Sequence, residues 1–242
     1  MKYGVQGLWL ALAMLAVGCV QIEQDLTLNR DGGGVVHLAY ATQDGEVTLT
    51  QQAAREFLRQ SLAVRGGAAR LPQDMSDAEI RKQFVEYARW GVQLDRLSTE
   101  RKADRVVRRA TISFKNLQGL ARALLPERRV LLSRDARGHY LLAQQPGGGA
   151  SATSRLAAVI ADESNPLVPE LLNGFRASLR VTAPGRVVEA NATQTAQNAA
   201  TWRFDFDRDP QAVSRLLQQP MRMVFDGQGL NLVPFIQAGG AR

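Results

Sequence analysis

The chain has 242 residues, with 30 lysines and arginines against 23 aspartates and glutamates, which gives a formal net charge of +7. It contains one cysteine and two histidines, which excludes an intramolecular disulfide and a metal site built from several cysteines. The length is sufficient for one large domain or two small ones with a hydrophobic core.

The first 18 residues have the parts of an export signal. Lys2 supplies a positive charge, an apolar run extends from about residue 8 to residue 17, and Gly18 is a small residue at its end. The run is shorter than the roughly 20 residues that cross a bilayer. A buried helix of the mature fold is the alternative interpretation, but it does not explain why the single cysteine, Cys19, follows directly.

Residues 15–19 (LAVGC) resemble a lipobox, the bacterial motif at which diacylglycerol is attached to a thiol and the chain is then cut. We therefore predict a signal peptide over residues 1–18, cleavage between Gly18 and Cys19, and lipidation of Cys19 with palmitate-like chains. A processed cysteine carries three acyl chains, and each buried methylene contributes about 0.8 kcal/mol, so attachment to the cell envelope should be permanent. Val20, where an aspartate would favour the inner membrane, favours the outer membrane if the source has two membranes.

The first half of the mature chain predicts a hairpin, two helices and a second hairpin. Apolar and polar residues alternate over residues 20–28 and 35–40, around a glycine-rich turn at 29–34. A helical insertion is expected at about 49–90, with one helix over 49–64 and another that begins at a capping box of Ser76 and Glu79. Strands at 91–100 and 105–114 form the second hairpin.

The second half predicts a short helix over 116–125, a hairpin over 129–133 and 139–144, and a mobile glycine-rich loop at 146–154. Helical pieces over 156–172 precede strands at 175–182, 186–191 and 201–206, with a turn at 183–185. Asp209 and Pro210 are expected to begin a helix, and 221–225 to form a final strand. The order predicts a single α+β domain over 19–242, a mainly antiparallel sheet of hairpins with inserted helices packed on one face.

Basic residues cluster in the middle of the chain. One interpretation is a surface that contacts anionic lipid, because each basic side chain near such a surface contributes about 1 kcal/mol. The other is a set of solvated strand faces. The candidates for anionic-lipid contact are Arg101, Lys102, Arg105, Arg128 and Arg129.

No catalytic set, metal site or cofactor site is predicted, so we do not expect an enzyme. His37 and His139 each lie on an expected strand without a neighbouring histidine, cysteine or close carboxylate, and no serine-nucleophile motif is present. Asp205, Asp207 and Asp209 lack the glycine and terminal glutamate of a calcium loop. Nucleic acid is not expected as a partner of an exported chain.

Several stretches together resemble the LppM-like family of bacterial lipoproteins. They are Gly18-Cys19, residues 25–29 (DLTLN), 31–36 (DGGGVV), 183–188 (APGRVV), Ala190-Asn191 and residues 202–204 (WRF). The resemblance implies a compact α+β module with a groove that holds a lipid or glycolipid. The helical, arginine-rich middle departs from the pattern, and the C-terminal transmembrane segment of many members is missing, so no functional residue is carried over.

Three functional hypotheses remain open. The first is a non-enzymatic envelope lipoprotein that binds a lipid or another hydrophobic ligand between its sheet and helices. The second is a structural or assembly lipoprotein that contacts other envelope proteins through a sheet edge or its basic hairpins, and an envelope hydrolase is a third. An apolar cavity between helices and sheet would favour the first.

Overall fold

The computed structural model describes residues 20–43, 53, 75–103, 105–125, 128–145, 158, 160 and 165–237. Over these residues the chain is α+β, with twelve strands in two mostly antiparallel sheets and four α-helices, which confirms the predicted fold class. The structure has two sheets where the sequence predicted one. Apart from Ala53, the helix expected over 49–64 lies outside the described residues, and so does the loop at 146–154.

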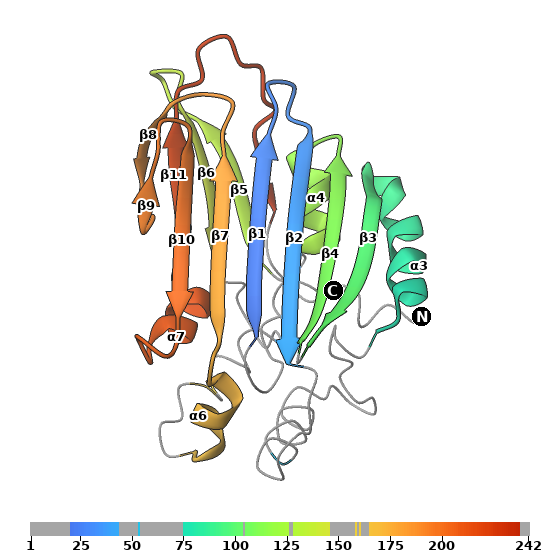
Figure 1. Cartoon of the computed structure of the whole chain (residues 1–242). Helices are drawn as coiled ribbons and strands as arrows, with labels where there is room; N and C mark the ends of the chain where they lie inside the picture. Colours follow the sequence, from blue (N-terminus) through green and yellow to red (C-terminus); the bar gives the residue numbers. More distant parts are fainter. Residues whose placement is uncertain are drawn as a thin grey trace.

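The larger sheet has the strand order β3-β4-β2-β1-β7-β10-β9 (Figure 1). All neighbours pair antiparallel except β1 and β7, which run parallel. Its strands are β1 (Gln21–Leu28), β2 (Gly34–Gln43), β3 (Val92–Lys102), β4 (Arg105–Phe114), β7 (Arg176–Thr182), β9 (Gln194–Thr195) and β10 (Ala199–Asp205).

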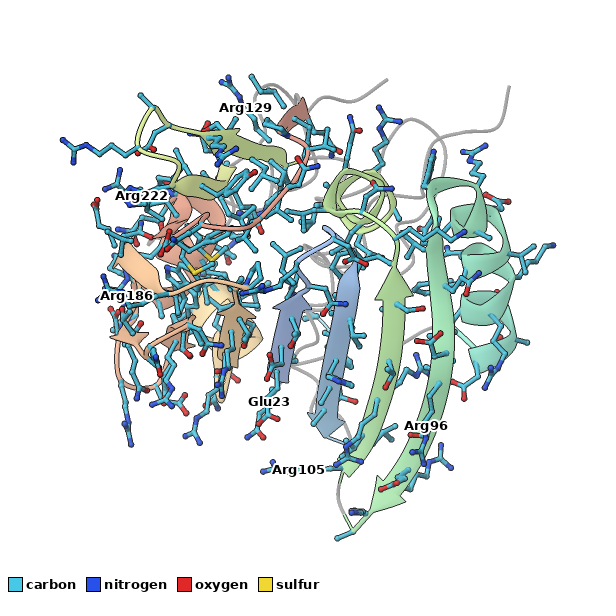
Figure 2. All side chains as sticks on the ribbon, turned by 90° about the horizontal axis from the view of Figure 1, so that it is seen from above. Glu23, Arg96, Arg105, Arg129, Arg186 and Arg222 are labelled. Atoms are coloured by element: carbon cyan, nitrogen blue, oxygen red, sulfur yellow. The ribbon has the colours of Figure 1, made fainter. Side chains whose placement is uncertain are left out.

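The smaller sheet has the order β12-β5-β6-β11-β8 and lies behind the β1, β7 and β10 side of the larger one (Figure 1). The view from above also shows two layers (Figure 2). Its strands are β5 (Arg129–Arg134), β6 (Tyr140–Gln145), β8 (Val187–Ala190), β11 (Met221–Phe225) and β12 (Phe235–Gln237). The predicted hairpins β1–β2, β3–β4 and β5–β6 are all confirmed.

The glycine-rich turn between β1 and β2 has the conformation that its residues favour. Gly32 has φ +87°, and the Asp31 carboxylate accepts a hydrogen bond from the Gly33 N–H at 3.0 Å. A Cβ on Gly34 would lie 2.1 Å from the Thr27 carbonyl oxygen, so only glycine fits where the two strands separate.

The turn at 183–185 connects the two sheets instead of closing a hairpin. β7 pairs with β1 and β10, whereas β8 pairs with β11 in the smaller sheet. At this crossing a Cβ on Gly185 would lie 2.0 Å from the Asp226 carbonyl oxygen, so the two backbones meet where only glycine fits. The sequence did not predict β9 and β12, which have two and three residues and are too short to show alternation.

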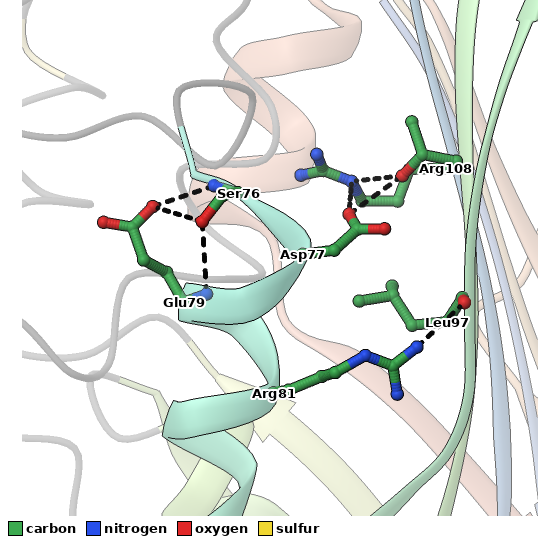
Figure 3. Close-up of polar contacts among 7 residues, drawn as sticks. Ser76, Asp77, Glu79, Arg81, Leu97 and Arg108 are labelled. Carbon is green, nitrogen blue, oxygen red and sulfur yellow. Dashed lines mark hydrogen bonds and ion pairs between the residues drawn. The ribbon is translucent and has the colours of Figure 1, made fainter.

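Helix α3 (Asp77–Tyr87) packs beside β3, and its start is the predicted capping box (Figure 3). The Ser76 N–H donates to Glu79 Oε2 at 2.8 Å, and the Glu79 N–H donates to Ser76 Oγ at 3.2 Å. Asp77 pairs with Arg108 of β4 at 3.4 Å, and Arg81 donates to the Leu97 carbonyl of β3 at 3.3 Å. Asp77, which directly follows the cap, and Arg81 therefore orient α3 against the sheet.

The other helices are α4 (Leu117–Leu124), α6 (Leu167–Leu172) and α7 (Ala212–Gln218). α4 contacts β3 and β4 of one sheet and β12 of the other. The prediction that Asp209 and Pro210 begin a helix was wrong by two residues. Asp209 Oδ1 accepts from the Gln211 N–H at 3.0 Å and forms a turn, after which α7 begins at Ala212.

Tyr140 fixes the C-terminal segment to the smaller sheet. Its side chain is 1% exposed, and its hydroxyl donates to the Leu232 carbonyl and accepts from the Leu232 N–H, both at 3.1 Å. We expect Tyr140→Phe to lower the free energy of unfolding by about 1–3 kcal/mol, because both backbone groups of Leu232 lose their partner. Urea unfolding measures the loss, and unchanged hydrogen exchange of the Leu232 amide would contradict this explanation.

Candidate functional site

An apolar cavity of about 100 Å³ lies between the two sheets and is partly open to solvent. Its walls come from β1, β2, β7 and β10 of the larger sheet, from β6 and β11 of the smaller sheet with Val130 of β5, and from α4 and α7. Most of its lining is aliphatic, aromatic or methionine side chains. The polar residues in the lining are Gln24, Gln144, Arg128 and Arg180.

Local sequence patterns explain the apolar walls. On β1, Ile22 and Leu26 are buried and line the cavity while Glu23 between them is exposed, as alternation along a strand requires. On α4, residues 117, 120, 121 and 124 line the cavity at the i, i+3, i+4 and i+7 spacing of one helix face. The Asn116 side chain starts this helix by accepting from the Gly119 N–H at 2.7 Å.

Asn191 holds one wall of the cavity in place. Trp202, which lines the cavity from β10, donates from Nε1 to the Asn191 carbonyl at 3.1 Å. The Asn191 amide donates to the Pro220 carbonyl at 2.7 Å, and its Oδ1 accepts from the Arg222 N–H at 2.9 Å. Asn191 therefore connects β10 of one sheet to the start of β11 in the other.

Among the described residues, Arg128 is the buried charged group of the cavity lining. It is 3% exposed, and its Nη2 donates to the Leu216 carbonyl of α7 at 3.1 Å. Its Nη1 is buried and has no hydrogen-bond partner. Burial lowers the pKa of the Arg128 guanidinium to about 10, so the side chain still carries its positive charge at neutral pH.

The prediction that Arg128 belongs to an exposed basic surface is therefore wrong. Val130 and Leu132 of β5 point inward, and Arg128 lies two residues before Val130, in step with them. The same alternation that predicted β5 could have placed Arg128 on the inner face. Charge counting concealed this, because it grouped Arg128 with the neighbouring Arg129, which is exposed.

The other predicted lipid-contact residues do not form one surface. Arg101, Lys102 and Arg105 lie at the end of the β3–β4 hairpin, and Arg129 begins β5. Figure 2 shows Arg105 and Arg129 at opposite edges of the molecule. A hydrogen bond from Lys102 and the charge of Arg109 hold the pKa of Glu100 below its usual value. Anionic-lipid contact by these four residues stays a prediction.

Asp205, the last residue of β10, and the two aspartates after it form ion pairs with arginines. Asp205 and Asp207 each lie 3.4 Å from Arg176, and Asp209 pairs with Arg215. His37 Nδ1 lies 3.3 Å from Thr111 Oγ1 across the strands. His139 lies 3.4 Å from Asp135, a carboxylate that the sequence did not place beside it.

Cys19 lies outside the described residues, but the chain enters the larger sheet immediately after it. Val20 is 1% exposed, and its carbonyl accepts from the Arg176 N–H at 2.8 Å. Packing thus explains a valine at this position, and the outer-membrane placement inferred from it is not supported. Ile22 lines the cavity and lies about 10 Å of extended chain from Cys19. None of the described helices is long and apolar enough to cross a bilayer.

No protein-family model and no curated protein sequence matches the chain. Among solved structures, the NMR structure of the folded domain of LppM from Mycobacterium tuberculosis is similar, with 11% sequence identity and a TM-score of 0.39. The match covers 96% of this chain and 99% of that chain. Membership of the LppM-like family stays a prediction.

Proposed function

We propose that this protein is a non-enzymatic, lipid-anchored lipoprotein of the bacterial envelope that holds an acyl chain between its two sheets. The observation that carries the proposal is the apolar cavity, whose lining includes Ile22, three residues after the predicted lipidation site at Cys19. A cavity with this lining, close to a membrane, suits the hydrocarbon of a lipid. Apolar surfaces that leave water on binding supply the affinity.

The position of the cavity supports the same function. β1 starts at the end of the larger sheet where α6 and α7 lie (Figure 1). The cavity is lined by Ile22 near the start of β1, by Leu216 of α7 and by Met221 at the start of β11. Leu26, Val36 and Val181 also line it, so the cavity extends along the sheet from the end of the molecule at which Cys19 would attach the domain to the bilayer, where acyl chains are available.

Ala121→Leu tests the cavity. Ala121 is 1% exposed and lines the cavity from α4, and three added carbon atoms would occupy much of the space of about 100 Å³. We expect the full-length protein, extracted from membranes in a non-ionic detergent, to retain an acyl-chain ligand in native mass spectrometry. Ala121→Leu should lower that occupancy roughly tenfold, the equivalent of the usual cost of overpacking.

Val85→Leu is the matched control, because Val85 lies on α3 outside the cavity and is 76% exposed. The control should retain the ligand as the parent protein does. The proposal fails if the parent protein carries no acyl ligand and binds neither added 1-octanol nor added octanoate. It also fails if Ala121→Leu binds as well as the parent.

The second candidate is an assembly role, and the edges of the smaller sheet favour it. Among the described strands, β8 and β12 are the outer strands of this sheet, and they expose Val188 (48%) and Ile236 (63%). Edge strands with exposed apolar side chains are sites of strand pairing between chains. A photocrosslinker at Ile236 should then give one discrete adduct in cells, whereas one at Val85 should not.

A further inference from the structure

The buried guanidinium of Arg128 indicates which acyl ligand the cavity takes. We propose that the ligand carries a carboxylate, which accepts a hydrogen bond from Arg128 Nη1 while the first carbons of its chain occupy the apolar cavity. This inference rests on the proposed function and adds a headgroup class to it. Arg128 is then the residue that distinguishes acids from neutral lipids.

A purely structural role explains only one of the two terminal nitrogens of Arg128, Nη2. The Leu216 carbonyl lies in the last turn of α7, and the residue four positions later is Pro220, which has no N–H to donate. Arg128 Nη2 supplies the missing donor at 3.1 Å. Nη1, on the same group, has no partner. Among the described buried side-chain atoms without a partner, the other four are oxygens, so Nη1 is the donor left for an anion.

The charge of the lining selects an anion. Among the described lining residues, Arg128 is the buried charged one, Arg180 is exposed, and none is an aspartate or glutamate. A buried positive charge without a counterion is costly, and an ionised ligand that pairs with it removes that cost. A neutral lipid fills the same space but leaves Nη1 unpaired, so the arginine favours an acid over the corresponding alcohol.

The size of the cavity selects a single chain. A cavity of about 150 Å³ lined by aliphatic and aromatic groups holds a benzene ring. By that scale the cavity between the two sheets, of about 100 Å³, encloses roughly four carbon atoms. A carboxylate and the first methylenes fit, and the rest of the chain extends through the open side. A phosphoglyceride headgroup with two acyl chains exceeds the enclosed volume, which is why we assign a fatty-acid-like carboxylate.

The test compares octanoate with 1-octanol, two ligands that share a chain and differ in the headgroup. The full-length protein in a non-ionic detergent is titrated with carboxyl-¹³C octanoate, and binding is followed by NMR. We expect a separate bound carboxyl resonance whose shift stays constant between pH 5 and pH 8, because pairing with Arg128 keeps the carboxylate ionised. Octanoate dissolved in the micelle alone should titrate over this range. Octanoate should bind at least about tenfold more tightly than 1-octanol.

Arg128→Met removes the donor and keeps an apolar side chain of similar length. It should reduce octanoate affinity by about tenfold or more and leave 1-octanol binding unchanged, which also shows that the cavity is intact. If Arg128→Met binds neither ligand, the preference of Arg128→Lys for octanoate over 1-octanol decides whether the positive charge selects the acid. A retained preference for octanoate in the lysine variant supports the assignment, and a lost preference overturns it.

Two results separate this inference from the proposed function. If both ligands bind the parent protein equally, or if Arg128→Met keeps the preference for octanoate, the headgroup assignment is wrong and the acyl-chain function stands. If neither ligand binds the parent protein and the extracted protein carries no acyl ligand, the proposed function itself is wrong.

Discussion

Replacing Cys19 with serine is expected to abolish lipidation and signal cleavage together. The thiol is the only one in the chain, and serine has no sulfur to accept diacylglycerol. When cells are fed an alkyne analogue of palmitate, the parent protein should incorporate the label and Cys19→Ser should incorporate none. The variant should also keep residues 1–18, which mass spectrometry of the intact protein detects as a higher polypeptide mass.

Val20→Ala is the control for this substitution, because it lies beside the cysteine and leaves the thiol unchanged. It should be labelled and cleaved like the parent protein, although it removes two methyl groups from the core, where Val20 is 1% exposed. Continued incorporation of the label into Cys19→Ser would show that another residue carries the lipid. The lipobox interpretation of residues 15–19 would then be wrong.

Phe225→Ala is expected to have the largest effect on stability. Phe225 is fully buried in β11 and stacks on Tyr140 with a distance of 5.7 Å between ring centroids. Its truncation leaves a cavity in the smaller sheet and should lower the free energy of unfolding by about 3–5 kcal/mol. This is a large part of the roughly 5–15 kcal/mol that holds a typical domain folded, so urea unfolding should shift to a clearly lower midpoint.

Val233→Ala provides the comparison, because Val233 is 80% exposed in the same C-terminal region. Its unfolding midpoint should stay close to that of the parent protein, since exposed apolar truncations change stability by less than about 0.5 kcal/mol. If Phe225→Ala unfolded at the same urea concentration as Val233→Ala, β11 would not be part of the cooperative core.

Features that depend on near neighbours in the chain were predictable. The capping box at Ser76 and Glu79 predicted the start of α3, because both partners lie within one helical turn. The alternation of apolar and polar residues predicted the strands of three hairpins. The glycines at 32 and 34 predicted the turn between strands β1 and β2. The wrong prediction of a helix start at Asp209 also has a cause in neighbouring residues. An aspartate side chain accepts a similar backbone hydrogen bond in a turn and at the start of a helix, so the sequence pattern is the same for both.

The site shows the limit of this reasoning. Asn191 and Trp202 stood out in the sequence, but their contact joins β10 to the start of β11 and depends on how two sheets pack. Arg128 was counted with the surface charges, although its parity with Val130 indicated the interior. Residues that face each other across a cavity lie far apart in the sequence. Arg128 and Leu216, for example, are separated by 88 positions.

The sequence by itself determined the α+β class and the boundaries of most described elements, because each depends on composition or on periodicity within one segment. It also predicts the anchor at Cys19, which stays a prediction. The tertiary structure alone decided that the chain crosses to a second sheet at Gly185, that an apolar cavity lies between the sheets, and that Arg128 is buried there with one unpaired donor. The physical reason is that burial and pairing are properties of surfaces brought together by folding, and such surfaces have no representation in any single stretch of sequence.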